Sequence, residues 1–140
     1  MIILKSKRPK VEVLGRYLLP VLFYLALLVF LTLRPQSELP EIDLPYIDKL
    51  VHFFLFLGLS FLISRFLYMG LGRERLWKIY VCSSLLSVLY GALDEFYLQT
   101  IAEGRQTEFW DYLLNVTGSL SGPALLPLYK KIRDRFLNSR

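Results

Sequence analysis

Four apolar runs take up most of this 140-residue chain, and each is long enough to cross a lipid bilayer. They cover residues 17–33, 51–71, 76–98 and 109–129. A hydrocarbon core of about 30 Å requires about 20 mostly apolar residues in a helix, because a helix rises about 1.5 Å per residue. Apolar residues make up 54% of the chain and charged residues 21%, which excludes an ordinary soluble domain. We therefore predict an all-α membrane protein, folded as a four transmembrane helix bundle.

The basic residues predict how this bundle is oriented. They gather before the first run, around the connection between the second and third, and after the fourth, whereas the other two connections contain only Arg34, Lys49 and Arg105. Basic segments stay on the cytoplasmic side, so we expect both termini to be cytoplasmic and the chain to be a multi-pass protein of the inner (cytoplasmic) membrane. Because topology and anionic lipids account for the net charge of +5, no nucleic-acid partner is predicted.

The same pattern predicts the domain organisation. We expect a basic cytoplasmic N-terminal segment at 1–16, the transmembrane domain at 17–129 and a basic cytoplasmic tail at 130–140. The connection at 34–47 contains three prolines, so it is expected to be irregular and to cover part of the outer end of the bundle.

Polar side chains cluster at the outer ends of three predicted helices. The set comprises Asp48, Lys49 and His52 at the start of the second, Asp94, Glu95 and Gln99 at the end of the third, Arg105 in the following loop, and Asp111 and Asn115 at the start of the fourth. An ionisable group at mid-bilayer costs about 2.5–3.5 kcal/mol, so such groups usually face a protein interior or a water-filled cavity. We therefore expect this set to meet in one site at the extracytoplasmic end.

Small residues at four-residue spacing indicate how the helices pack. Ser87 and Gly91 lie on the same stripe as Glu95, and Gly118 and Gly122 form a GxxxG pair that continues the stripe of Asn115. Because such residues let helix backbones approach closely in lipid, we expect the third and fourth helices to pack along these stripes. The glycine pair could equally join two copies in a homo-oligomer.

The loop before the fourth helix is expected to hold Arg105 over the mouth of the site. Gly104 permits a turn with positive φ, and Thr107 is a candidate N-cap for the helix that follows.

The ordered polar set resembles the VanZ-like family of small membrane proteins. The resemblance runs from Asp48 to about Gly122 and is carried by Asp48-Lys49-x-x-His52, Asp94-Glu95, Gln99, Gly104-Arg105 and Asp111-x-x-x-Asn115-x-x-Gly118. It implies that residues 17–129 form a VanZ-like domain, with a link to the cell envelope and to glycopeptide (teicoplanin) resistance. The general biochemical activity of the family is not established, so the resemblance implies no reaction.

One position departs from the family pattern. The family places its acidic residue three positions before the glutamine, whereas Glu95 lies four positions before Gln99. Either a residue is inserted here or Glu95 takes the position usually held by an aspartate, which leaves the roles of Asp94 and Glu95 unseparated.

Three functions fit these residues. In a binder, Asp48, Lys49, Gln99, Arg105, Asp111 and Asn115 would recognise an anionic lipid or a lipid-linked envelope precursor. In a hydrolase or transferase acting on such a lipid, His52 would be the general acid or base, with Asp94 or Glu95 orienting it. In a structural partner subunit, the same set would only fix the register of the helices.

The sequence leaves the cofactor unknown. A divalent cation would take His52 with Asp94, Glu95 or Asp111, and these oxygen-rich ligands favour Mg²⁺ or Ca²⁺ over structural zinc. Their spacing is not diagnostic of any metal.

Overall fold

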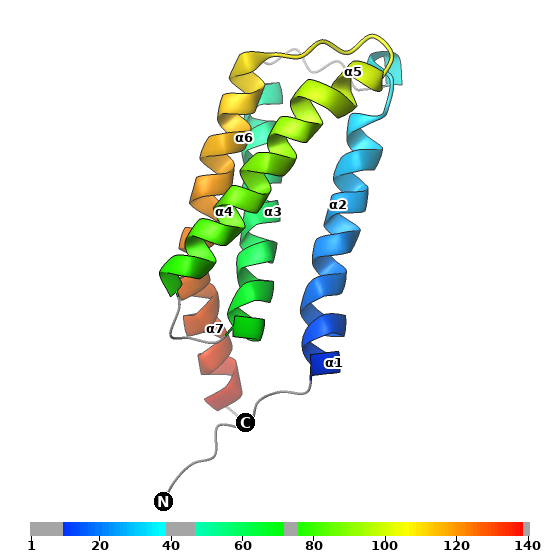
Figure 1. The fold of residues 1–140 in the computed structure, drawn as a ribbon. Helices are drawn as coiled ribbons and strands as arrows, with labels where there is room; N and C mark the ends of the chain where they lie inside the picture. Colours follow the sequence, from blue (N-terminus) through cyan, green and yellow to red (C-terminus); the bar gives the residue numbers. More distant parts are fainter. Residues whose placement is uncertain (1–9, 39–46, 72–75, 139–140) are drawn as a thin grey trace, which may run out of the picture.

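All regular elements in the described part of the chain are helices (Figure 1). The computed structural model describes residues 10–38, 47–71 and 76–138. The first helical stretch comprises α1 (Lys10–Val13), a π-helical turn η1 (Leu14–Leu18) and α2 (Leu19–Thr32), followed by a short 3₁₀ turn η2 (Gln36–Glu38). The second is α3 (Ile47–Leu71). The third comprises α4 (Leu76–Leu93), a π-helical turn η4 (Asp94–Leu98) and α5 (Gln99–Ile101). The fold therefore confirms the prediction of an all-α protein.

Three of these stretches are long and apolar enough to cross a membrane. They are Leu14–Thr32, Ile47–Gly70 and Leu76–Ile101. They correspond to the first three predicted spans, each with small shifts at its ends. These three helices indicate a multi-pass membrane protein.

The fourth predicted span is divided. It consists of α6 (Phe109–Ser121), a 3₁₀ turn η5 (Gly122–Leu125) and α7 (Leu126–Asn138). Pro123 lacks an amide hydrogen and its ring crowds the preceding turn, which accounts for the change of helix type. Because α7 continues to Asn138, most of the segment predicted as a separate tail is helical.

Two other predicted segments are described only in part. The first helix begins at Lys10, within the predicted N-terminal segment, and residues 1–9 lie outside the described residues. Of the connection at 34–47, only its start and end are described, so its expected role as a cover lies outside the described residues.

The bundle buries many polar side chains beside an apolar cluster around Phe56 and Leu59, and it exposes many apolar side chains. Ser60, Ser87 and Asn115 are fully buried, whereas Leu86 and Phe54 are more than half exposed. A water-soluble bundle shows the reverse distribution. In lipid, by contrast, helices are held together by close packing and interhelical hydrogen bonds, and apolar side chains face the solvent.

The central helix is α3, which contacts α2, α4 and α6. A Cβ atom added at Gly118 would meet the backbone of Phe53 and Leu57, and one added at Gly122 would meet Ser60 and the backbone of Leu57 and Phe61. The prediction that the glycine pair packs the fourth helix against the third was therefore wrong. A GxxxG pattern identifies a helix face made of small residues, but it does not indicate which neighbouring helix packs against that face.

A second face of α6 packs against α4. Ser87 and Ser119 are 2.7 Å apart through their hydroxyl oxygens, and Gly91 lies directly against the side chain of Asn115. Ser87 and Gly91 of the third predicted helix therefore do contact the fourth. Their partners there are Ser119 and Asn115, and not the glycine pair. Since Gly118 and Gly122 are both buried against α3 within one chain, the predicted homo-oligomer would need another surface.

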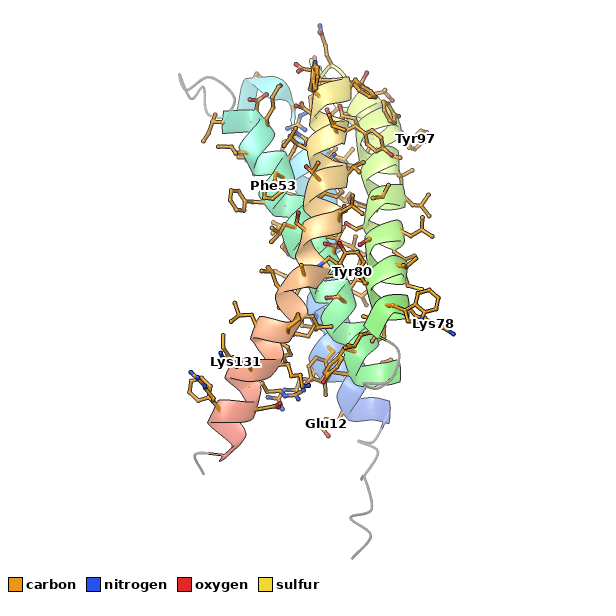
Figure 2. The ribbon with its side chains drawn as sticks, turned by 90° about the vertical axis from the view of Figure 1, so that its left-hand side faces the viewer. Glu12, Phe53, Lys78, Tyr80, Tyr97 and Lys131 are labelled. Atoms are coloured by element: carbon orange, nitrogen blue, oxygen red, sulfur yellow. The ribbon has the colours of Figure 1, made fainter. Side chains whose placement is uncertain are left out.

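The two ends of the bundle differ in character. α1 begins and α7 ends at one end, called the basic end below, toward which Lys78 and Lys131 lie in Figure 2. The start of α3, the segment α5 and the start of α6 form the other end, called the polar end, which also holds Tyr97 (Figures 1 and 2). This arrangement brings the polar residues singled out from the sequence to one end of the molecule.

Candidate functional site

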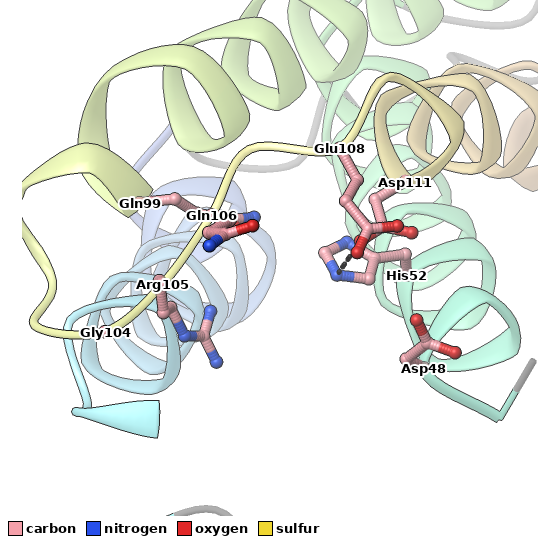
Figure 3. A pocket seen from close by; sticks show the side chains of 8 residues that line it. All are labelled: Asp48, His52, Gln99, Gly104, Arg105, Gln106, Glu108 and Asp111. Atoms are coloured by element: carbon pink, nitrogen blue, oxygen red, sulfur yellow. Dashed lines mark ion pairs between the residues drawn. The ribbon is translucent and has the colours of Figure 1, made fainter. Parts of the chain in front are cut away.

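A cavity of about 350 Å³ opens at the polar end of the bundle. Figure 3 shows its lining in two groups on opposite sides of the cavity. One group lies on α5 and the loop that follows it: Gln99, Gly104, Arg105 and Gln106. The other lies on the first turns of α3 and α6: Asp48, His52, Glu108 and Asp111. We call these the arginine wall and the acidic wall.

Lys49 lies at the centre of the carboxylates of the acidic wall. Its Nζ atom is 3.1 Å from a carboxylate oxygen of each of Asp48, Glu108 and Asp111. Oxygens of the same three carboxylates lie within 4.8 Å of one another, which is a spacing that could hold a metal ion. The ammonium group of Lys49 lies among these three carboxylates and neutralises part of their charge. A metal ion is not required for that purpose.

His52 is held by the fourth helix. Its Nδ1 atom is 3.0 Å from Oδ1 of Asn115, and its Nε2 atom is 3.8 Å from Oδ2 of Asp111. Because an amide oxygen can only accept, this contact requires a proton on Nδ1. In the neutral ring Nε2 then carries the lone pair, on the side of Asp111 and the cavity (Figure 3).

Glu95 fixes the loop that carries Arg105. Its Oε1 atom accepts a hydrogen bond from the backbone amide of Glu108 at 2.8 Å, and its Oε2 atom accepts one from Nε2 of Gln99 at 2.7 Å. Glu108 is the N-cap residue of α6 and makes no side-chain capping bond of its own. The prediction that Thr107 caps this helix was therefore wrong, because the carboxylate of Glu95 satisfies the first free amide from a different helix.

Asp94 faces the first helix. Its Oδ1 atom accepts a hydrogen bond of 2.6 Å from the hydroxyl of Thr32 at the end of α2. Asp94 and Glu95 are both buried, and they reach different neighbours within one π-helical turn, which is closed by the bond from the Gln99 amide to the Asp94 carbonyl. Neither acid makes a hydrogen bond with His52 among the described residues; the expected orienting role belongs to Asn115 and Asp111 in this structure.

Arg105 is the remaining predicted residue, and its side chain makes no hydrogen bond or ion pair among the described residues, although its charge acts on the carboxylate of Asp94. Its backbone follows the turn at Gly104, whose φ of 75° confirms the predicted positive value. Its Nε atom is buried without a hydrogen-bond partner among the described residues. In Figure 3 its guanidinium extends into the space between the two walls. Arg105 is therefore one of the residues that line the cavity.

The structure brings most of the predicted site together. Five predicted residues line the cavity directly: Asp48, His52, Gln99, Arg105 and Asp111. Lys49 and Asn115 contact that lining, whereas Asp94 and Glu95 support it from behind.

Sequence reasoning did not assign Glu108, Gln106 or Thr32 to the site. Thr32 is the one hydroxyl in the last turn of an otherwise apolar helix, a signal that could have identified it.

Comparisons with known proteins give no relatives for this chain. No protein-family model matches it, and neither a curated protein nor a solved structure does. The function proposed below therefore rests on the residues and geometry of the chain itself.

Proposed function

We propose that this multi-pass membrane protein binds the phosphate-bearing headgroup of an anionic lipid or a lipid-linked cell-envelope precursor in the cavity at its polar end. The observation that carries the proposal is Arg105, whose guanidinium extends into the cavity and whose buried Nε atom has no hydrogen-bond partner among the described residues. A guanidinium matches phosphate with two parallel hydrogen bonds, and the amides of Gln99 and Gln106 lie beside it.

The proposal includes a topology. α6, η5 and α7 would form the fourth crossing, so that both termini lie in the cytoplasm and the polar end faces outward from the inner membrane. Lys78 and Lys131 lie toward the basic end, which supports this orientation because basic segments are retained on the cytoplasmic side. The cavity would then meet the headgroups of the outer leaflet.

We also propose that the chain is VanZ-like. The π-helical turn at Asp94–Leu98 supports this assignment, because a π-bulge adds one residue to an α-helix. Such an insertion would account for the spacing from Glu95 to Gln99, which is one residue longer than the family pattern. A link to teicoplanin resistance follows from the assignment and remains part of the proposal.

Lipid retention by the purified protein tests the binding function. Native mass spectrometry of the Arg105→Ala variant should show loss of the phospholipid that wild-type protein retains from total membrane lipid. Arg34→Ala is the matched control, because Arg34 lies near the same end, pairs with Glu38 and does not line the cavity. Equal retention by wild type and Arg105→Ala would contradict the proposal.

A second candidate function is hydrolysis or group transfer on the bound lipid. The observation that favours it is the geometry of His52, whose Nδ1 is engaged by Asn115 while Nε2 is left toward the cavity. In that arrangement Nε2 could take a proton from a water molecule or a hydroxyl group that attacks a phosphate held by Arg105. The bond from phosphorus to one alcohol oxygen of the lipid would break, and Nε2 would return the proton to that oxygen as the alcohol leaves.

Product analysis separates this candidate from binding alone. Protein incubated with total membrane lipid should yield a new lipid product, and His52→Ala should abolish the product while retaining the lipid. Retention of lipid without any product in wild type would exclude the catalytic candidate. A His52→Ala protein that fails to fold would instead favour a purely structural role for this residue.

A further inference from the structure

The charges of the cavity do not suit a simple anion. The lining and Lys49 together bring three carboxylates, one guanidinium and one ammonium, so the site carries an excess of one negative charge when His52 is neutral. A phosphate bound by Arg105 would therefore lie across the cavity from an acidic wall. That wall has only one cation for its three carboxylates.

We propose that the ligand carries a primary ammonium group beside its phosphate, as in the headgroup of phosphatidylethanolamine. The inference rests on the phosphate recognition in the proposed function, and it replaces the anionic lipid by a zwitterionic one, because the headgroup of phosphatidylethanolamine has no net charge. The phosphate lies at the arginine wall and the ammonium at the acidic wall. The ammonium supplies the positive charge that the carboxylates of Asp48, Glu108 and Asp111 still lack.

The hydrogen-bonding capacity of the acidic wall supports an ammonium rather than a neutral group. The Nζ atom of Lys49 contacts one oxygen of each carboxylate, so the second oxygens of Glu108 and Asp111 have no bond to it, and that of Asp111 lies 3.8 Å from Nε2 of His52. A primary ammonium carries three N–H donors, as the lysine side chain does. A trimethylated amine has the same charge but no N–H donor, so the site should discriminate between the two.

The size of the cavity favours a headgroup of this kind. Binding sites for small molecules usually measure about 300–1,000 Å³, and this cavity, at about 350 Å³, is near the lower limit. A phosphoethanolamine group fits such a volume, whereas the sugar and peptide portion of an envelope precursor does not. The acyl chains would remain in the surrounding bilayer.

Lipid competition on the full chain tests this inference. Detergent-purified protein is titrated with phosphatidylethanolamine, phosphatidylcholine and phosphatidylglycerol of identical acyl chains, and occupancy is read by native mass spectrometry. We expect phosphatidylethanolamine to bind about fivefold more tightly than the other two, which is the upper range for one partly exposed ion pair.

A pair of matched variants assigns the preference to the acidic wall. Glu108→Gln keeps the shape of the side chain and removes one negative charge, so it should abolish the preference for phosphatidylethanolamine over phosphatidylglycerol. Glu103→Gln removes an exposed acid that does not line the cavity and should keep the preference.

The outcomes distinguish the inference from the proposed function. Phosphatidylglycerol binding as well as or better than phosphatidylethanolamine would overturn the inference, yet it would leave phosphate recognition by Arg105 intact. Binding of none of the three lipids, together with equal retention of membrane lipid by wild type and Arg105→Ala, would overturn the proposed function itself. Loss of the preference in Glu103→Gln as well would show that net charge, and not the acidic wall, determines it.

Discussion

Lys49 joins the first turns of α3 and α6. It contacts Asp48 on its own helix and both Glu108 and Asp111 at the start of α6. The side chain of Lys49 is mostly buried, whereas those of Asp48 and Glu108 are about half exposed, so each ion pair is partly screened by water. The main effect of Lys49 is to keep three like charges close together on one wall of the cavity.

Removal of this ammonium should turn the acidic wall into a cation site. We expect Lys49→Met to lower the free energy of unfolding by about 1–2 kcal/mol, and we expect millimolar Ca²⁺ to restore stability to this variant alone. Thermal melting in detergent with and without CaCl₂ measures both effects. Lys78→Met, near the other end, is the control. Equal stabilisation of wild-type protein by Ca²⁺ would show that Lys49 does not occupy the position of a cation.

Thr32 has a comparable role for the first helix. We expect Thr32→Val to destabilise the protein by about 1–3 kcal/mol, because it leaves the buried carboxylate of Asp94 without its hydroxyl donor. Hydrogen exchange should become faster in the last turn of α2. Thr117→Val is the matched control, since the Thr117 hydroxyl bonds only to its own helix. Similar exchange in both variants would mean that this bond does not hold α2.

At the scale of the elements, α6 is the helix that determines the geometry of the site. Its Gly118 contacts the backbone of α3, as does Gly122 directly after it, and its Asn115 and Ser119 contact α4. The same helix carries Asp111 and Asn115, which contact Lys49 and His52. A displacement of α6 would therefore change the position of the acidic wall relative to both neighbouring helices.

The glycine contact makes a direct prediction. Gly118→Ala should destabilise the protein by about 1–3 kcal/mol, because the new methyl group would overlap backbone atoms of Phe53 and Leu57 that cannot rotate away. Gly70→Ala is the control, since nothing lies within 4 Å of its added carbon. Unfolding of both variants in detergent measures the difference. A Gly118→Ala protein as stable as Gly70→Ala would contradict the observed helix contact.

The sequence predicted the helices well and their contacts less well. Apolar length is a local property, so the first three membrane-crossing helices could be predicted within a few residues. The partner of Gly118 could not, because a small-residue pattern has no information about the facing helix. The 3₁₀ turn at Gly122–Leu125 interrupts a run that composition alone describes as continuous.

The same distinction applies to the candidate site, where the set of residues was predictable and their contacts were not. Convergence of His52, Arg105 and Asp111 was predictable, because the cost of ionisable groups in lipid drives them to one pocket. The individual bonds were not. Glu95 reaches the amide of Glu108 and Asp94 reaches Thr32 from within the π-helical turn η4, and no propensity rule identifies that turn in advance.

At the scale of the whole molecule, the buried polar side chains and the exposed apolar side chains together define how the protein lies in a membrane. The cavity and the basic helix α7 are at opposite ends of the bundle, separated by the length of its helices (Figure 1). A ligand bound in the cavity would therefore be exposed to one leaflet, and the basic residues of α7 would contact the other.

Cysteine labelling tests this orientation. In a Cys82→Ala background, Glu103→Cys should react with a membrane-impermeant maleimide added to intact cells, whereas Lys131→Cys should react only after permeabilisation. Both positions are exposed in the structure. Labelling of Lys131→Cys in intact cells would contradict the four-crossing topology with cytoplasmic termini.

The close approach of α6 to α3 has a consequence for how this sequence can change over time. Gly118 packs directly against the backbone of Phe53 and Leu57. The register between the two helices therefore does not depend on the identity of the large apolar residues that face outward. Substitution of exposed residues by other apolar residues would not shift Lys49 relative to Asp111; examples are Leu86, Leu120 and Phe54. The lipid-facing side chains can therefore change to suit bilayers of different thickness or fluidity while the cavity keeps the same shape.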